Sequence, residues 1–368
     1  MQENEAQRLR YGYTTGSCAT AATVAALSAL LNQEAQQTVT IVLPSEDSAT
    51  FTVEECFVDS RGALCGVRKD AGDDPDVTDG LIIRSEVTIR KDIPRGTVLF
   101  LQGEGVGRVT LSGLGIPVGE PAVNPVPRHM IMRAVRSLLK KYRVDGGVAV
   151  TLSIPGGKEV AKRTMNEKVG VVDGLSIIGT SGIVVPYSEE AYIESIRRSL
   201  RVALYSGCRD VAIVAGARSE KHLKKLLPDF PDQAFVHYGN RIGVTLEIIR
   251  ECAGFESVTV SVMLAKATKL AQGELDLSSR NVAVNRDFIA GLARSAGYDN
   301  DICHSLLDIS LVRNIVKSIP FRKGEPFYRE LSRECYRVCG RLVPGIRLAF
   351  VLMNSDGICI VRNALDEK

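Results

Sequence analysis

The sequence contains no tryptophan, and only 5% of its 368 residues are aromatic. Single-stranded nucleic acid is usually bound on exposed aromatic rings, so that function is not expected here. Neither sign of charge is in excess, because 46 lysines and arginines are matched by 43 aspartates and glutamates. A net charge of +3, with no basic stripe or tail, argues against a nucleic-acid-binding domain.

Long hydrophobic runs are missing as well. No apolar run approaches the roughly 20 residues that cross a bilayer, and the first ten residues lack the apolar centre of a signal peptide. The nine cysteines are scattered and odd in number, which is not the pattern of a disulfide framework. The sequence therefore predicts a reduced, cytoplasmic protein with no membrane partner.

Apolar residues make up 45% of the sequence, which is enough to form a sizeable core. A length of 368 residues predicts one very large or two ordinary domains. Apolar periodicity predicts helices at about 17–31, 128–142 and 193–204. Strand-like runs precede residue 190, and after it short apolar strands alternate with helical segments, as in a covered parallel sheet. We therefore expect domains at 1–190 and 191–368, the second ending in a hairpin that turns at Asp356-Gly357. The strand-like segments are TVTIVLP, TFTVEECFV, LIIRSEVTIR, TVLFLQG, GVAVTLSIP, DVAIVAGA, QAFVHYG and SVTVSVML.

The first predicted helix begins in the stretch RYGYTTGSCATAATVAALSALL, which is made almost wholly of small residues. Thr15, Gly16 and Ser17 are candidate caps, and the helix amides with nearby hydroxyls form a weak anion site. The small residues leave room for either a ligand or a closely packed strand. Cys18 is either a nucleophile with a lowered pKa or a buried small residue, and the second interpretation is favoured because no partner histidine is apparent.

The segment RKDAGDDPDVTDG contains five aspartates within ten positions. Such crowding is repulsive unless the carboxylates meet a cation, hydrogen-bond donors or water. The spacing of a calcium loop is not met. A solvated turn is the favoured interpretation, although the Gly and Pro content indicates a loop of fixed shape that could bind a ligand.

Two further segments are rich in glycine. GEGVGRVTLSGLGIPVGEPAVNPVPR does not match the dinucleotide-binding pattern, because a strand is expected after Gly107, but its backbone could approach a ligand closely. Arg108 and Arg128 are either carboxylate clamps or ordinary salt-bridge partners. In GLSIIGTSGIVVPYSEEA, the Gly-Thr-Ser-Gly turn either cradles an anion through its amides or only connects the two domains.

Taken together and in this order, these segments resemble the CbiD family, the cobalt-precorrin-5B C(1)-methyltransferases of anaerobic cobalamin synthesis. The resemblance implies that S-adenosylmethionine methylates ring carbon 1 of a cobalt-containing tetrapyrrole. It also implies an α+β N-terminal domain (ribosomal-S5-domain-2-like, permuted) and a smaller Rossmann-like α/β C-terminal domain. The matching blocks are LRYGYTTGSCATAA, KDAGDDPDVTDG, LSGLGIPVGEPAVNPVPRHMI, SIPGGKEVAKRTMN, GLSIIGTSGIVVPYSEEA and, more weakly, VMLAKATKLAQGELDLSSR.

The reaction implied by the resemblance needs groups that align a methyl donor, hold its carboxylate and ribose, and clamp an acidic ring. We expect the catalytic groups to be Thr14, Thr15, Ser17 and Cys18. The expected cofactor-binding residues are Gly16, Asp70, Asp73, Asp74, Glu104, Thr180, Ser181 and Gly182. The expected substrate-binding residues are Arg10, Arg108, Asn124, Arg128 and Lys162. Cobalt belongs to the substrate and no protein metal site is expected, since Cys335 and Cys339 are better explained by packing.

The later part of the chain departs from the family pattern, because it reads AGARSEKHL in place of a glycine-rich turn and has Ser278 in place of a histidine. Two alternatives therefore stay open. One is a non-catalytic tetrapyrrole carrier or scaffold of the same pathway. The other is a phosphate-handling transferase, although the P-loop pattern is absent. Channelling to other cobalamin-pathway enzymes and oligomer formation are both compatible with the sequence.

Overall fold

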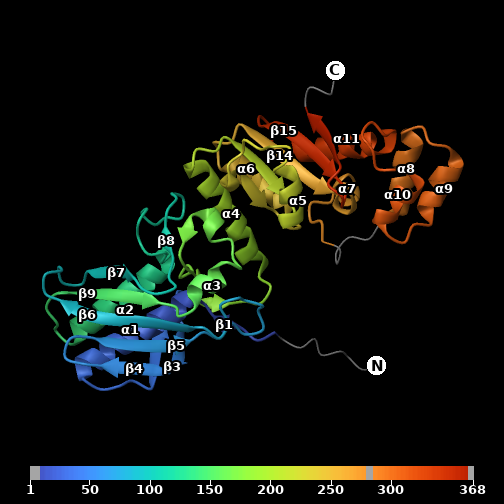
Figure 1. Cartoon of the computed structure of the whole chain (residues 1–368). Coiled ribbons are helices and arrows are strands. Elements are labelled where there is room, and N and C mark those ends of the chain that lie inside the picture. Colours follow the sequence, from blue (N-terminus) through green and yellow to red (C-terminus); the bar gives the residue numbers. More distant parts are fainter. Residues whose placement is uncertain (1–8, 279–284, 364–368) are drawn as a thin grey trace, which may run out of the picture. The chain divides into compact units, whose positions relative to one another are not determined.

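The computed structural model describes residues 9–278 and 285–363. The chain divides into two compact units, Met1–Glu189 and Glu190–Lys368, which we call the first and second units (Figure 1). Within the described ranges, no helix has both the length and the apolar character needed to cross a membrane.

The first unit is built on a five-stranded sheet in the order β4-β5-β6-β9-β7, in which only the β7–β9 pair is parallel. A separate hairpin and two short strand pairs, β1–β11 and β8–β10, complete its β-structure. Its strands are β1 (Gly12–Tyr13), β2 (Thr38–Val42), β3 (Ser48–Thr52), β4 (Glu55–Val58), β5 (Ala63–Arg68), β6 (Ile82–Arg90), β7 (Val98–Gln102), β8 (Arg108–Val109), β9 (Gly147–Ser153), β10 (Val171–Val172) and β11 (Ile183–Val184). Its helices are α1 (Thr15–Asn32), α2 (Pro125–Lys141), α3 (Gly157–Ala161) and η1 (Glu167–Val169).

Helix α1 is the centre of the first unit, and its small residues serve close packing. It lies against β5, β6 and α2, and Ala19, Ala22 and Ala26 are fully buried there. Thr23 Oγ1 lies 2.9 Å from Ser85 Oγ on β6, which shows how closely helix and strand approach. The room left by the small side chains is therefore filled by the protein's own sheet and neighbouring helix. Of the two interpretations, the closely packed strand is confirmed.

The second unit contains a sheet in the order β13-β12-β14-β15-β16. The first four strands are parallel, and β16 is antiparallel to β15. Its strands are β12 (Asp210–Val214), β13 (Phe235–His237), β14 (Ser257–Met263), β15 (Arg347–Met353) and β16 (Cys359–Asn363). Its helices are α4 (Glu189–Tyr205), α5 (Ala217–Leu223), η2 (Asp232–Ala234), α6 (Ile242–Glu251), α7 (Leu264–Leu270), α8 (Arg286–Ser295), α9 (Asn300–Leu307), η3 (Val312–Asn314), α10 (Ile315–Ser318) and α11 (Pro326–Gly340).

Both faces of this second sheet are covered. Helix α5 packs on one face, while α4, α6 and α11 bury their apolar stripes on the other. Figure 1 shows these helices around the sheet. Cys335 and Cys339 on α11 lie in this core, and Cys335 donates a hydrogen bond to the carbonyl of Ala267 at 3.2 Å. The predicted packing role of the two cysteines and the predicted C-terminal hairpin are both confirmed.

Candidate functional site in the first unit

Three segments that are far apart in the sequence meet at the N-terminus of α1. The amide of Tyr13 donates to the carbonyl of Asp70 at 2.7 Å, which joins β1 to the aspartate loop. The amide of Gly16 donates to the carbonyl of Ile178 at 2.9 Å. The amide of Thr14 donates to the carbonyl of Gly182 at 3.1 Å. The TTGS turn, the aspartate loop and the Gly-Thr-Ser-Gly segment therefore form one continuous cluster, which we call the motif cluster (residues 9–18, 69–80 and 176–187).

The polar groups of the TTGS turn are directed into the protein. Thr14 is the N-cap of α1, because its Oγ1 accepts from the amide of Ser17 at 3.2 Å. The hydroxyl of Ser17 donates to the carbonyl of Gly182 at 2.7 Å. Thr15 Oγ1 donates to the carbonyl of Ile178 at 3.1 Å and accepts from its amide at 2.9 Å. These hydroxyls hold segments together, so the expected anion site at this helix end is already filled by the chain's own oxygens.

Cys18 lies directly behind this turn and is fully buried in the core of the first unit. Burial is the main reason that the pKa of its thiol rises to about 12. A thiol with that pKa stays protonated at neutral pH and is a poor nucleophile. This corrects the expectation of a catalytic Cys18 and favours its interpretation as a packing residue.

The aspartate loop is fixed by hydrogen bonds rather than freely solvated. Asp70 forms an ion pair with Arg10 and accepts from the amide of Gly72 at 2.9 Å. The hydrogen bond from Arg10 is the main cause of the lowered pKa of Asp70. Asp73 accepts from the amide of Arg10 at 2.6 Å, and Asp74 accepts from the amide of Tyr187 at 2.9 Å. The loop is therefore bound on one side to the N-terminal strand and on the other to the segment that follows β11.

A buried ion pair under this loop was not expected from the sequence. The side chain of Lys69 is only 1% exposed, and its Nζ lies 2.8 Å from Asp76 Oδ2. Asp76 Oδ1 accepts from the amide and the hydroxyl of Thr78 at 2.8 and 2.7 Å. Burial, the largest single influence, acts to raise the pKa of Asp76, but Lys69 and Thr78 together lower it. The available signal for this pair was a lysine directly before a dense acidic run.

The Gly-Thr-Ser-Gly segment has unused hydrogen-bond donors. The amides of Thr180, Ser181 and Gly182 donate to no group in the part of the chain that the structure describes. The turn is held from within, because Ser181 Oγ accepts from the amide of Ile183 at 3.2 Å and donates to its carbonyl at 3.0 Å. Gly182 has a φ of +84°, a left-handed conformation that glycine adopts without strain. Successive free amides of this kind can cradle an anion.

The glycines at 103, 105 and 107 have a different role from the one expected. A Cβ on Gly105 would lie 2.0 Å from the carbonyl oxygen of Ile154, and one on Gly107 would lie 2.9 Å from that of Gly174. A Cβ on Gly103 would likewise lie 2.0 Å from Ser153 Oγ. This backbone approaches the chain's own loops, so close approach to a ligand is not needed to explain these three glycines.

The expected substrate clamps are held by the protein to different extents. Arg128 is almost fully engaged, because it donates to the carbonyls of Val123 and Pro121 at 2.8 and 3.1 Å and pairs with Glu120 at 2.6 Å. Its role in fixing this loop contradicts the expectation of a free clamp. Arg108 and Lys162 are exposed, and each pairs with a surface carboxylate: Arg108 with Asp173 at 3.9 Å and Lys162 with Glu159 at 2.7 Å. Glu104 is also exposed, and Asn124 precedes α2 without capping it through its side chain.

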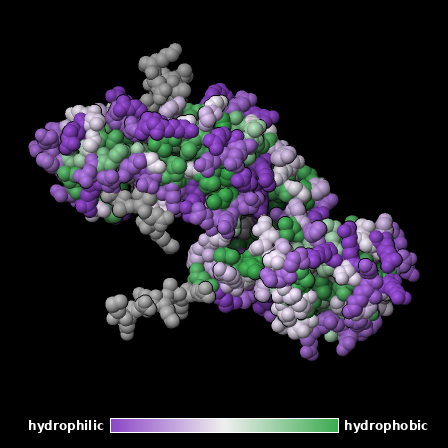
Figure 2. Space-filling view, turned by 180° about the vertical axis from the view of Figure 1, so that it is seen from behind, coloured by the Kyte–Doolittle hydropathy of each residue, from purple (hydrophilic) through white to green (hydrophobic). Residues whose placement is uncertain are grey.

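An apolar hollow of about 650 Å³ adjoins the motif cluster. Its described lining consists of Leu9, Tyr11, Val185 and Pro186, which flank the β1–β11 pair. Tyr11 is 60% exposed and Leu9 48% exposed, which is unusual for side chains of this size. Figure 2 shows that hydrophilic residues dominate the visible surface, with apolar residues gathered in separate patches. An exposed apolar hollow of this size is a candidate ligand site.

Comparison with known proteins matches the part of the chain that contains the motif cluster to a known family. A family model described as CbiD matches residues 2–186, and a second, described as CbiD, C-terminal domain, matches residues 276–364. The chain belongs to the CbiD family. A Prosthecochloris aestuarii protein named cobalt-precorrin-5B C(1)-methyltransferase is 55% identical over 353 residues, which are 96% of each chain. Proteins of the same name from Priestia megaterium and Geobacillus kaustophilus are 40% and 41% identical, covering 90% and 92% of this chain and 89% and 90% of theirs.

Among solved structures, a cobalamin biosynthesis protein (cbiD) from Archaeoglobus fulgidus is 29% identical and covers 73% of this chain and 82% of its own, with a TM-score of 0.40. The predicted CbiD resemblance is thus confirmed by the family models and by the curated relatives.

The departure at residue 278 lies in the second unit of this CbiD chain. The amide of Ser278 donates to Asp276 at 2.9 Å, and its carbonyl accepts from the buried Lys269 at 3.0 Å. Both contacts use the main chain, which a histidine would also supply. The serine therefore leaves these two hydrogen bonds intact. No group of His, Cys, Asp and Glu side chains suited to a metal ion occurs among residues 9–278 and 285–363.

Proposed function

We propose that this protein transfers a methyl group from S-adenosylmethionine to ring carbon 1 of cobalt-precorrin-5B, a step in building the corrin ring of cobalamin. The observation that carries the proposal is 55% identity, over 96% of both chains, to a protein named for that reaction. The cluster formed by three of the characteristic sequence blocks supports a common site for donor and substrate in the first unit.

S-adenosylmethionine supplies an electrophilic methyl group on a sulfonium, together with a carboxylate, an amino group and ribose hydroxyls that a protein can bind. We propose that the amides of Thr180, Ser181 and Gly182 hold the carboxylate, because no described acceptor occupies them. Asp73 is exposed, and among the described residues only its Oδ2 is bonded. Its other oxygen can accept a hydrogen bond from the ribose or the amino group.

The remaining residues of the motif cluster shape this donor site. Asp70 and Asp74 tie the loop that carries Asp73 to Arg10 and Tyr187. Gly16 allows α1 to pass close to Pro127, because a Cβ there would lie 2.6 Å from Pro127 Cγ. The hydroxyls of the TTGS turn act as positioning groups, since each is bonded to the Gly-Thr-Ser-Gly segment or to its own helix.

We propose that the macrocycle rests one apolar face in the hollow lined by Leu9, Tyr11, Val185 and Pro186. Its acidic arms need cations, and Arg108 and Lys162 can exchange their exposed carboxylate partners for those arms at little cost. Arg10 stands directly between Leu9 and Tyr11 in the sequence and is proposed as a further cation for those arms. Asn124 and Glu104 are proposed as polar contacts at the edge of the same site.

The protein's contribution to such a reaction is alignment. Displacement at a sulfonium neutralises charge in the transition state, so a strong general base need not act on the attacking carbon. Holding the two reactants in line can contribute roughly 7–11 kcal/mol. The tightly bonded motif cluster provides the rigidity that this alignment requires, and a ring bound in the apolar hollow would displace water from its lining.

At the level of fold, we propose that the first unit is a permuted ribosomal-S5-domain-2-like domain and the second a Rossmann-like domain. The parallel order β13-β12-β14-β15 with helices on both faces supports the second assignment. Channelling to neighbouring enzymes of the pathway and self-association are compatible extensions of the proposal.

Calorimetric titration tests the proposal against its two alternatives. Binding of S-adenosylmethionine and S-adenosylhomocysteine, followed by one added methyl on cobalt-precorrin-5B detected by mass spectrometry, would support the methyltransferase. Binding of ATP alone would favour a phosphate-handling transferase. Tetrapyrrole binding without donor binding would favour a carrier.

A further inference from the structure

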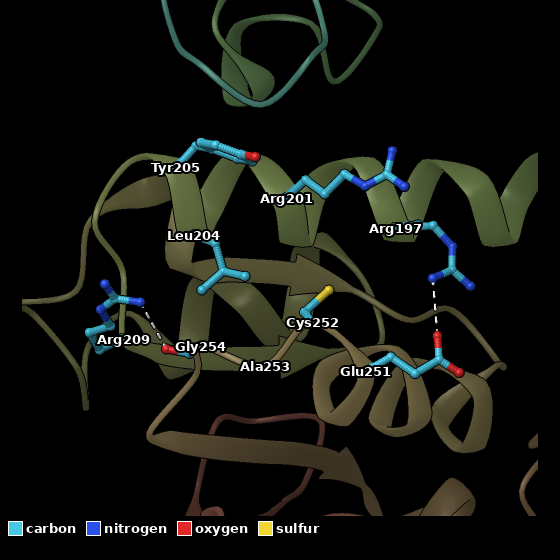
Figure 3. A pocket seen from close by; sticks show the side chains of 9 residues that line it. All are labelled: Arg197, Arg201, Leu204, Tyr205, Arg209, Glu251, Cys252, Ala253 and Gly254. Atoms are coloured by element: carbon cyan, nitrogen blue, oxygen red, sulfur yellow. Dashed lines mark hydrogen bonds and ion pairs between the residues drawn. The ribbon is translucent and has the colours of Figure 1, made fainter.

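The second unit has a basic pocket that the proposed donor and substrate sites do not use. It has a volume of about 440 Å³ and lies between the C-terminal part of α4 and the turn that joins α6 to β14 (Figure 3). Leu204 and Cys252 form an apolar floor, and three arginines stand around it. Its lining residues are Arg197, Arg201, Leu204, Tyr205, Arg209, Glu251, Cys252, Ala253 and Gly254.

The arginines are not equally neutralised. Arg197 Nη1 lies 3.1 Å from Glu251 Oε2, and its Nε lies 4.0 Å from Glu194. Among the residues that the structure describes, the Arg209 side chain donates only to a neutral acceptor, the carbonyl of Gly254, at 3.1 Å. Arg201 forms no hydrogen bond or ion pair with any residue of the described part of the chain. Arg201 and Arg209 therefore leave two positive charges at the pocket without a carboxylate.

An ordinary structural role explains only part of this arrangement. Helices α4 and α6 both end here, and cations near helix C-termini are favourable. The hydrogen bond from Arg209 to the carbonyl of Gly254, just beyond α6, fits that role. Arg201 makes no such contact, although its side chain lies beside the pocket along α4 (Figure 3).

The arginines lie close enough to Cys252 to act on its charge. Burial is the largest influence and raises the pKa of this thiol, and Glu251 adds to the rise, whereas Arg197 and Arg201 attract the anion and act to lower the pKa. A carboxylate placed beside the sulfur would experience the same attraction. The exposed ring of Tyr205 and the side chain of Leu204 offer apolar surface for the methylene groups of such a ligand.

We propose that this pocket, by itself and separately from the site in the first unit, binds two neighbouring carboxylate arms of a tetrapyrrole, an inference that rests on the proposed function for the identity of the ligand. Two carboxylates match the two uncompensated arginines in charge, and guanidinium groups bind carboxylates through paired hydrogen bonds. The volume suits side arms with an apolar stem. The pocket would thus distinguish tetrapyrroles by the carboxylate arms on their outer edge.

The test uses the full chain and the reactivity of Cys252. Cobalt uroporphyrin, a ring with acetate and propionate arms, should slow alkylation of Cys252 by iodoacetamide, measured peptide by peptide by mass spectrometry. Cys359, another half-buried thiol of the second unit whose pKa is raised by burial, is the internal control and should react unchanged. The same ring with its arms converted to amides should protect neither thiol.

Arg201→Gln should weaken the protection of Cys252 about tenfold or more, the effect of losing a charge-assisted hydrogen bond. Arg313→Gln, at an exposed arginine of η3 outside the pocket, is the matched control and should behave like the wild type. Equal protection in both variants, or protection by the amide ring, would overturn the inference.

Methyl transfer is measured separately, so the two proposals can fail independently. Unchanged protection of Cys252 in Arg201→Gln, together with normal methyl transfer, would refute the pocket and leave the enzyme assignment standing. Arg201-dependent protection of Cys252 without any methyl transfer would support the pocket and refute the methyltransferase.

Discussion

Replacing Asp76 by asparagine should destabilise the first unit by about 3 kcal/mol. The side chain of Lys69 is 1% exposed, and Asp76 is the only carboxylate within ion-pair distance of it among the described residues. Breaking a buried pair by removing one partner costs about 3–5 kcal/mol. The value should lie at the low end, because Asp76 is 26% exposed and an amide oxygen can still accept a hydrogen bond. The ceiling is about 4.6 kcal/mol, the free energy of deprotonating an ordinary lysine at pH 7.

The complementary change should cost less. Lys69→Met leaves Asp76 bonded to the amide and hydroxyl of Thr78 and partly in water, so we expect about 1 kcal/mol. The double variant should cost about 1–2 kcal/mol, well below the sum of the single changes, because no buried charge is left unpaired. Since the pKa of Asp76 is lowered, the stability that its carboxylate contributes is present above the ordinary aspartate pKa and is lost as the pH falls through the lowered value.

Urea unfolding followed by circular dichroism gives these free energies, and hydrogen exchange of peptides from residues 65–82 localises them. Peptides from the second unit serve as the internal reference. A loss below about 1 kcal/mol for Asp76→Asn, or strictly additive single changes, would show that the pair is solvated and that the buried-charge argument is wrong.

Three further predictions concern the same unit. Gly16→Ala should destabilise the protein by about 1–3 kcal/mol, because its Cβ would lie 2.6 Å from Pro127 Cγ; an unchanged melting temperature would contradict this. Thr180→Glu should weaken S-adenosylmethionine binding about tenfold or more, because its carboxylate would repel the donor carboxylate beside the free amides, whereas Thr180→Gln should not. Equal Kd values by calorimetry would show that the donor carboxylate does not bind at this turn. Between pH 8 and 10 the unfolded thiol of Cys18 ionises while the native one, with a pKa of about 12, stays protonated, so this group should lower stability by about 2 kcal/mol as pH rises. Cys18→Ala should remove that part of the pH dependence in urea titrations, and parallel curves for both proteins would refute it.

Local patterns in the sequence predict individual elements well. The helix expected at about 17–31 is observed as Thr15–Asn32, although the cap is Thr14 rather than one of the next three residues. The helix expected at 128–142 begins earlier, at Pro125, since proline is well suited to a first helical turn. The stretch TFTVEECFV, expected as one strand, is two strands interrupted between Thr52 and Glu55.

The arrangement of the site depends on contacts that no local pattern reveals. Strand β5 was not expected, because ALCGVR contains glycine and cysteine and lacks clear alternation; it forms only because β4 and β6 pair with it on either side. Residues in the motif cluster are more than 160 positions apart, as Thr15 and Ile178 are. Composition does not show that the amides of Thr180–Gly182 are free whereas those of Gly16–Cys18 are hydrogen-bonded. The difference depends on which acceptor oxygens the fold places next to each amide.

The glycines at 103, 105 and 107 have a practical consequence for redesign. Gly103 lies against strand β9, and Gly105 and Gly107 lie against neighbouring loops, at separations that exclude any side chain, so a library varied at these positions would return mostly misfolded chains. Val118 offers more freedom, because its side chain is 58% exposed. The glycines at 113, 115 and 119 do not, since each has a positive φ that a residue with a side chain adopts only with strain. A library meant to keep the fold should therefore vary exposed side chains such as Val118 and leave the glycines as the fixed frame.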